Sequence, residues 1–210
     1  MAGMRRRYDF YCPVAHALRL VGERWALLLV LELMGGPKRY TDLAEALPGI
    51  GTNILADRLR DLEAGGILAK RKLPPPAASR VYELTEYGRA LRPAIRELAI
   101  WGARSLGPPT GDDELFPGWL ENALDTVVAP LAPPGRFEFR VGDEVASIVD
   151  GEAQTGPVED PDVVVETDPV GIYHMFVDRR LDLGTIRGDR ALLAQLIDTT
   201  PEHVDLPVPA

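Results

Sequence analysis

The chain has 210 residues, a formal net charge of −9, and 46% hydrophobic and 26% charged residues, values that are ordinary for a soluble globular protein. Its longest apolar run covers only residues 25–31, far short of the roughly 20 residues that a membrane span needs. The single cysteine, Cys12, excludes an internal disulfide. We therefore expect a cytoplasmic protein with no membrane partner.

Charge divides the chain near residue 109. Residues 1–109 hold 17 Lys and Arg against 11 Asp and Glu, a balance of +6, whereas residues 110–210 hold 6 against 21, a balance of −15. Salt confines electrostatic fields to about 10 Å, so a basic half can hold phosphates even in an acidic chain. The sequence therefore predicts two domains, over 1–107 and 115–210. A linker rich in Pro, Gly and Asp joins them over 108–114.

The first half of the sequence predicts helices followed by a hairpin. Apolar residues recur at helical spacing over 13–21, 25–34, 40–47, 52–63 and 86–106. Residues 67–73 and 80–84 alternate instead as two strands around a proline-rich loop. The helix over 52–63 is expected to turn Ile54, Leu55, Leu59 and Leu62 inward. The helix over 86–106 is expected to carry one apolar stripe, formed by Leu91, Ile95, Leu98 and Trp101.

The order of these elements is that of a winged helix-turn-helix: a helix, a Pro-Gly turn, a second helix that ends at Gly-Gly, and a hairpin. The second helix of such a motif places polar side chains in the major groove, which is about 12 Å wide, and hairpin cations neutralise phosphates. The predicted DNA-binding residues are Thr52, Asn53, Asp57 and Arg58 on the helix, and Lys70, Arg71, Lys72 and Arg80 on the hairpin. The alternative is a plain interaction module in which these residues form a solvated face.

Several separate motifs occur in this half: Cys-Pro at 12–13, Gly-x-x-Trp at 22–25, Leu-Pro-Gly-Ile at 47–50 and Tyr-x-Leu-Thr-x-x-Gly at 82–88. Over residues 8–106 the sequence resembles the HxlR-type winged-helix regulators. The resemblance implies a dimeric bacterial regulator, usually a repressor and sometimes an activator. It also implies that residues 52–63 form the recognition helix, and that the first and last helices of the domain make the dimer contacts.

Two positions depart from the family pattern. Gly51 stands where family members often have Ser, and Asn53 stands where they often have a cation. Glycine caps a helix less well than serine by roughly a few tenths of a kcal/mol, and asparagine still pairs with adenine edges. We therefore expect weaker phosphate binding at the start of this helix and a larger contribution from Lys70, Arg71 and Arg80.

Cys12 is a redox candidate. It lies just before Pro13 at a predicted helix start and close to three arginines at 5–7, and both surroundings favour the thiolate. The resemblance places the sensing cysteine of redox-responsive and electrophile-responsive family members at this position. The alternative, which we favour, is a small buried side chain. Without a second cysteine, sensing requires an intersubunit disulfide, a mixed disulfide or a covalent adduct.

The acidic half predicts a small α+β domain. Apolar spacing indicates a helix over 116–127, strands over 137–141, 145–149 and 163–167, and helices that begin at Pro169 and Arg190. Over residues 115–200 this order resembles the sterol-carrier-protein-like fold, which implies an apolar tunnel. The candidate ligand-binding residues are Trp119, Leu124, Tyr173 and Phe176, together with Met175. The alternative is that these side chains are plain core.

Taken as a whole, the sequence predicts an α+β protein, a winged helix-turn-helix domain followed by a sterol-carrier-like domain. The hypothesis for its function is a homodimeric regulator that binds a pseudo-palindromic site in double-stranded DNA and responds to an apolar small molecule. No cofactor, metal site or enzymatic activity is expected, because the histidines are scattered and no phosphate-binding loop is present. The first alternative is a carrier of a hydrophobic ligand whose winged helix mainly dimerises; an enzyme that uses the acidic domain is a second.

Overall fold

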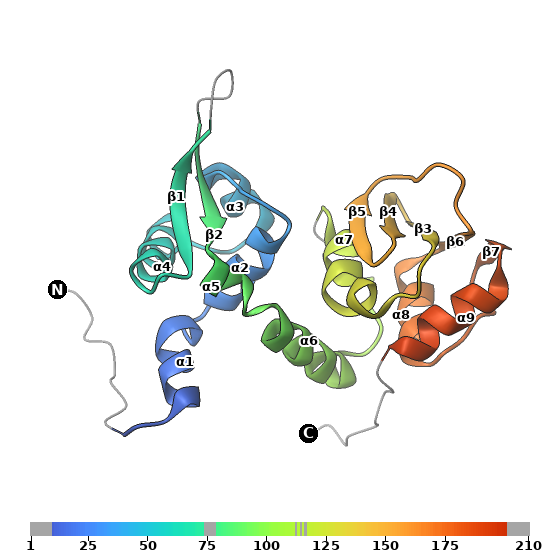
Figure 1. Cartoon of the computed structure of the whole chain (residues 1–210), viewed down its shortest axis with the longest axis horizontal. Coiled ribbons are helices and arrows are strands. Elements are labelled where there is room, and N and C mark those ends of the chain that lie inside the picture. Colours follow the sequence, from blue (N-terminus) through green and yellow to red (C-terminus); the bar gives the residue numbers. More distant parts are fainter. Residues whose placement is uncertain (1–9, 74–78, 112, 114, 116, 201–210) are drawn as a thin grey trace. The chain divides into compact units, whose positions relative to one another are not determined.

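The computed structural model describes residues 10–73, 79–111, 113, 115 and 117–200 (Figure 1). Four predicted features lie outside the described residues or partly so: the arginines at 5–7, the proline-rich loop, part of the linker, and Phe116 in the helix over 116–127. The chain divides into two compact units, residues 1–95 and 96–210, and helix α6 (Arg92–Leu106) contains the division.

The first unit consists of helices and one antiparallel hairpin. Its elements are α1 (Pro13–Val21), α2 (Ala26–Met34), α3 (Tyr40–Ala46), α4 (Thr52–Ala64), β1 (Leu68–Lys72), β2 (Arg80–Leu84) and α5 (Glu86–Arg89). In the hairpin Leu68 pairs with Leu84 and Lys72 with Arg80. The mixed α+β class and the winged helix-turn-helix order are confirmed.

A leucine-rich core holds the first unit together. Leu29, Leu43, Leu55, Leu59 and Leu62 are all fully buried. Full burial of one such side chain stabilises a fold by about 1.5–3 kcal/mol. The spacing of four and three residues between the α4 leucines places them in one stripe, so this helix is held through a single face.

The predicted inward position of Ile54 is wrong, since 43% of its surface is exposed. It precedes Leu55 by one residue, and one residue corresponds to about 100° around a helix, which turns Ile54 out of the leucine stripe. On α2, Leu28 is exposed for the same reason, because the neighbouring Leu29 occupies the core.

The single helix predicted over 86–106 is also wrong. The chain forms α5 over Glu86–Arg89 and then restarts as α6 at Arg92. Pro93 explains the break, because proline has no N–H for a helical hydrogen bond to the preceding turn but is tolerated in the first turn of a new helix. Of the predicted apolar stripe, Ile95 is buried, whereas Leu98 and Trp101 are exposed.

The Tyr-x-Leu-Thr-x-x-Gly motif fastens the end of the hairpin to its start. The Thr85 hydroxyl donates to the carbonyl of Gly66 at 2.6 Å and caps α5 by accepting from the Gly88 amide at 3.0 Å. A β-carbon at Gly88 would lie 2.0 Å from the Ile67 carbonyl oxygen. Only glycine therefore fits this close approach of two backbones.

The second unit is a five-stranded sheet with helices. After the helical segment α7 (Trp119–Ala123), which continues as a π turn over Leu124–Val128 and a 3₁₀ turn over Ala129–Leu131, come β3 (Arg136–Val141), β4 (Glu144–Val149), β5 (Glu152–Thr155), β6 (Val163–Thr167), α8 (Pro169–Val177), β7 (Thr185–Gly188) and α9 (Arg190–Thr199). The strand order is β5-β4-β3-β6-β7, with β3 and β6 parallel and the other pairs antiparallel. The predicted strands and helices are present, but β5 and β7 were not predicted.

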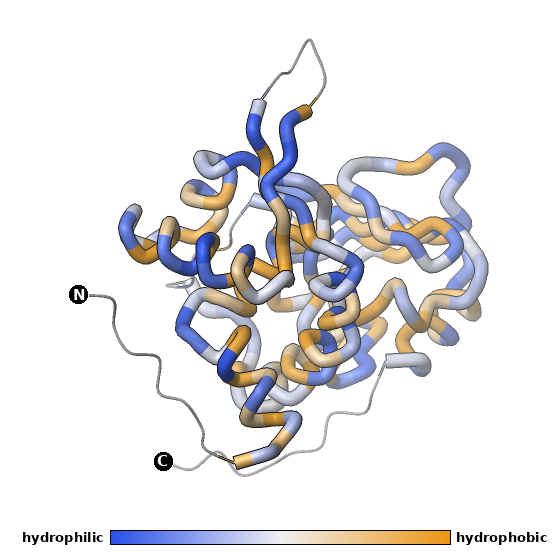
Figure 2. The backbone as a smooth tube through the Cα atoms, turned by 60° about the vertical axis from the view of Figure 1, so that its left-hand side comes forward, coloured by the Kyte–Doolittle hydropathy of each residue, from blue (hydrophilic) through white to orange (hydrophobic). Residues whose placement is uncertain are grey.

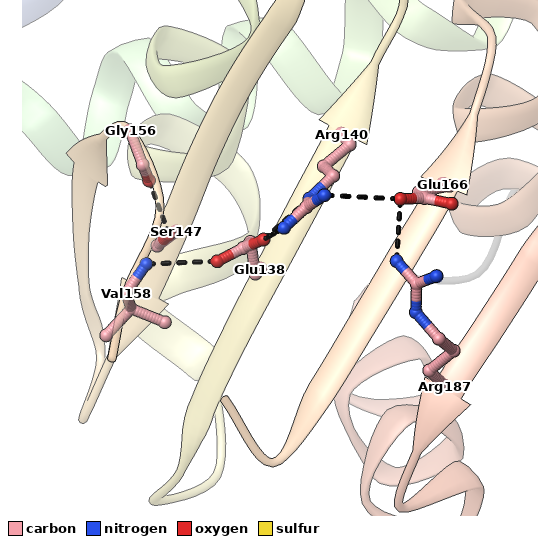
Figure 3. Close-up of polar contacts among 7 residues, drawn as sticks. All are labelled: Glu138, Arg140, Ser147, Gly156, Val158, Glu166 and Arg187. Carbon is pink, nitrogen blue, oxygen red and sulfur yellow. Dashed lines mark hydrogen bonds and ion pairs between the residues drawn. The ribbon is translucent and has the colours of Figure 1, made fainter. Parts of the chain in front are cut away.

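The two faces of this sheet differ because side chains alternate along each strand. On β3, Phe137, Phe139 and Val141 enter a core shared with the helices. Glu138 and Arg140 lie on the opposite face, where ion pairs run from Glu138 through Arg140 and Glu166 to Arg187 (Figure 3). The sheet is therefore apolar on its helix-covered face and charged on the other.

Candidate nucleic-acid interface

Helix α4 presents its first turn to solvent. Thr52, Asn53 and Ile54 are all exposed, whereas Leu55 begins the buried stripe. The Tyr40 hydroxyl donates to the Thr52 carbonyl at 2.8 Å, which joins the start of α3 to the start of α4. Between the two helices, Gly49 takes a φ of +85°, a conformation that favours glycine in this tight turn. The turn and this hydrogen bond fix the direction of the exposed end of α4.

Ion pairs hold the charged side chains farther along α4. Arg58 donates to Asp61 at 3.0 Å and lies 3.8 Å from the Glu23 carboxylate, and its side chain is only 18% exposed. Arg60 pairs with Asp57 but is 68% exposed. Arg58, a predicted DNA-binding residue, is thus less accessible than Arg60, which is not among the predicted DNA-binding residues.

Two of the four predicted hairpin cations are paired with carboxylates. Lys70 Nζ lies 2.6 Å from Glu63, and Arg71 lies 3.0 Å from Glu83 on the facing strand. The hydrogen bond to Glu63 raises the pKa of Lys70 above its ordinary value. The register that pairs Ala69 with Glu83 brings Arg71 near Glu83, whereas Lys70 meets Glu63 because β1 follows directly after α4.

The outer end of the hairpin carries the other two cations. Lys72 and Arg80 face each other in the ladder, are exposed, and form no ion pair within the part of the chain that the structure describes. Figure 2 colours this outer part of the hairpin mainly in the blue of hydrophilic residues. The geometry therefore brings together an exposed helix start and a hairpin whose outer cations remain available to phosphates.

Cys12 caps the backbone of α1 and is half-buried. Its carbonyl accepts from the His16 amide at 2.9 Å, while its side chain makes no capping hydrogen bond, and the thiol is free. The position at the start of a helix is as predicted. The neighbouring arginines at 5–7 lie outside the described residues.

The predicted ligand-binding residues of the second unit mostly gather at one core. Leu124 and Met175 are fully buried there, and Trp119 and Phe176 are half-buried against the same cluster. The ring of Phe176 lies 5.9 Å from that of Phe139. Tyr173 is the exception, because its ring packs edge-on against His174 at 5.4 Å instead.

Within the described ranges, no three His, Cys, Asp or Glu side chains are grouped so that they could hold a metal ion. None of the described helices is both long and apolar enough to cross a bilayer.

Comparisons with known proteins match the first half of the chain. The HxlR-like helix-turn-helix family matches residues 20–109. The chain is 37% identical over 98 residues to the HTH-type transcriptional regulator YodB of Bacillus subtilis (strain 168), covering 46% of this chain and 88% of YodB. It is 31% identical over 98 residues to the uncharacterized HTH-type transcriptional regulator YvaP of the same organism, covering 46% and 91%.

Among solved structures, the reduced form of the transcriptional regulator YodB from B. subtilis is similar, with a TM-score of 0.42, 35% sequence identity and coverage of 48% of this chain and 100% of that chain. The family match over residues 20–109 includes both α4 and the hairpin. The relatives are named as transcriptional regulators and not as enzymes. The chain belongs, through its first half, to the HxlR-like helix-turn-helix family of transcriptional regulators.

Proposed function

We propose that the protein regulates transcription, as a repressor, by binding a pseudo-palindromic DNA site as a homodimer. The observation that carries the proposal is the exposed first turn of α4 beside a hairpin whose outer cations, Lys72 and Arg80, form no ion pair with any described carboxylate. In this proposal α4 enters the major groove and the hairpin lies along the phosphates. The basic balance of residues 1–109 favours the same contacts.

The proposed reading of bases uses Thr52, Asn53, Asp57 and Arg58. Asn53 is exposed and suits an adenine edge, whereas Arg58 reaches a guanine only after leaving Asp61 and Glu23. The proposed phosphate contacts use Lys70, Arg71, Lys72 and Arg80. Of these, Lys70 and Arg71 form ion pairs with carboxylates that offset their charge. Lys72 and Arg80 are therefore expected to contribute most to phosphate binding.

Exposed apolar side chains support the homodimer. On α6, Leu98 is 49% and Trp101 is 65% exposed, and on α1, Val14 is 67% exposed. Large apolar side chains in contact with water are stabilised when a second copy covers them. A two-fold dimer would place two recognition helices about 34 Å apart, which matches one turn of the duplex.

The effector proposal concerns the acidic unit, for which we keep the sterol-carrier-like fold as a proposal. Trp119 and Phe176 are half-buried against the core cluster that contains Leu124, so an apolar ligand could pack against their exposed ring surface at the edge of this core. Such a ligand changes DNA binding only if it prefers one of two conformations. A thermal-shift screen of fatty acids, sterols and aromatic metabolites tests this, and no shift with any of them would contradict it.

The test of the central proposal is a mobility-shift titration of the full chain at several salt concentrations, on fragments that flank its own gene. Specific, salt-dependent binding is expected. Arg80→Ala should weaken binding to all sequences alike and flatten the salt slope by about one unit, because it removes one phosphate contact. Arg58→Ala should lose about 1–3 kcal/mol of base discrimination if its guanidinium pairs with guanine. The absence of any salt-dependent binding would overturn the proposal, whereas apolar ligand binding without DNA binding would favour the carrier alternative.

A further inference from the structure

Ile54 is an apolar side chain in an unusual place for one. It lies in the first turn of α4 between the exposed Asn53 and the buried Leu55, and 43% of its surface is in contact with solvent. The other large apolar side chains of this fully described helix, Leu55, Leu59 and Leu62, are at most 1% exposed. Ile54 therefore contributes little to the leucine stripe that holds the helix.

The base edges of the major groove offer an apolar partner to such a side chain. They carry hydrogen-bond donors and acceptors, and also the C5-methyl group of thymine. The residues at the N-terminal end of a recognition helix are the ones that reach base edges. Ile54 lies within this end, next to Thr52 and Asn53, whose polar groups suit the donors and acceptors of neighbouring bases.

We propose that Ile54 selects thymine by packing its side chain against the C5-methyl group, so that each half-site contains a thymine read through its methyl. The inference rests on the proposed DNA binding. Burial of one methyl group should raise affinity about fourfold, because the transfer of one CH₂ group out of water contributes roughly 0.8 kcal/mol. The contact favours thymine over cytosine, which has no methyl at this position.

The test begins with selection of preferred sequences from random duplexes by the full chain. Each thymine of the selected site is then replaced in turn by deoxyuridine, which removes only the methyl. In the wild-type protein one thymine of each half-site should lose about fourfold in affinity on replacement. In Ile54→Ala that replacement should have no effect, and in Ile54→Val, which keeps both branches at Cβ, most of the effect should remain.

A matched control is Val170→Ala, which truncates a side chain that is 40% exposed on α8 in the acidic unit. It should leave the deoxyuridine effect unchanged. The inference is overturned if Ile54→Ala keeps the wild-type loss at every thymine, or if it changes the mass of the protein by light scattering, which would assign Ile54 to a protein contact. It is also overturned if no thymine methyl matters to the wild type. If no DNA is selected or bound at any salt concentration, the proposed function itself fails.

Discussion

Lys70 Nζ lies 2.6 Å from the carboxylate of Glu63, so the first strand of the hairpin is tied to the last turn of the preceding helix. The same ammonium lies 5.7 Å from the centre of the Tyr82 ring on the facing strand. These contacts join α4, β1 and β2, and the exposed start of α4 and the outer hairpin cations are held in one frame. The ion pair also reduces the positive charge that the hairpin offers to phosphates, because Glu63 neutralises Lys70.

We expect Glu63→Gln to strengthen DNA binding. Loss of the carboxylate frees Lys70 for a phosphate, and one additional phosphate contact steepens the salt dependence of binding by about one unit. The exposed pair contributes at most about 1 kcal/mol to stability, so the fold should persist. The measurement is binding to a fixed duplex at four or more salt concentrations.

The control for this change is Glu45→Gln on α3, which removes an exposed carboxylate outside the hairpin. It alters the net charge equally but frees no hairpin cation. Equal effects of the two substitutions on the salt slope would show that overall charge, and not the release of Lys70, is responsible.

Trp101→Glu should dissociate the proposed dimer. The indole is 65% exposed on α6, and a carboxylate there would have to lose its hydration if a second copy covered it. The mass from light scattering at micromolar concentration should fall from two chains to one. Affinity for a two-half-site duplex should fall on the order of 10²-fold, because the two recognition helices no longer bind together.

Tyr87→Glu is the matched control, since this aromatic side chain on α5 is 55% exposed. It is expected to leave the mass at two chains. A wild-type protein that is already monomeric, or a Trp101→Glu variant that remains dimeric, would contradict the assignment of α6 to the dimer contact.

Cys12→Ser should change DNA affinity by less than about 0.5 kcal/mol, because a half-buried thiol without a resolving partner in the chain is replaced by a side chain of similar size. The measurement compares wild type and variant with and without diamide. A large loss of binding on oxidation that disappears in Cys12→Ser would instead make Cys12 a sensor, acting through another subunit or a small thiol.

Much of the first unit could be predicted from sequence because its elements have strong local signals. The leucines of α4 repeat at three and four residues, and Gly65 and Gly66 end the helix, so its bounds were within one residue of those observed. The prediction of a single helix over 86–106 is wrong because the apolar period continues across Pro93, whereas the helix itself is interrupted just before this proline.

The candidate site was harder to predict because accessibility depends on partners from other elements. Arg58 has the spacing of an outward-facing side chain, yet Glu23, which lies 35 residues earlier, helps to hold it. The strand β5 (Glu152–Thr155) has no run of apolar residues that would predict it, and it is extended because it pairs with β4. Such long-range contacts override local propensity and leave little trace in the pattern of one segment.

The final prediction concerns Glu138, which is 2% exposed on the charged face of the acidic unit's sheet. Its carboxylate accepts from Arg140 Nε at 2.7 Å and from the Val158 amide at 3.0 Å (Figure 3). The Ser147 hydroxyl donates to the Gly156 carbonyl at 2.6 Å beside it. Two buried side chains thus hold the segment between β5 and β6 against this face.

Glu138→Ala should therefore release that segment. The Val158 amide would lose its buried acceptor, which costs about 1–3 kcal/mol, while Arg140 would keep Glu166 at 3.4 Å and access to water. Hydrogen exchange of the peptide over 156–162 should accelerate, and urea should unfold the acidic unit at a lower concentration. Glu166→Gln is the control: this carboxylate is 37% exposed, so its loss should cost less than about 1 kcal/mol and leave the exchange of Val158 unchanged. Equal exchange in the two variants would mean that the carboxylate of Glu138 does not hold the segment, and that the backbone pairing of β5 and β6 with their neighbours suffices.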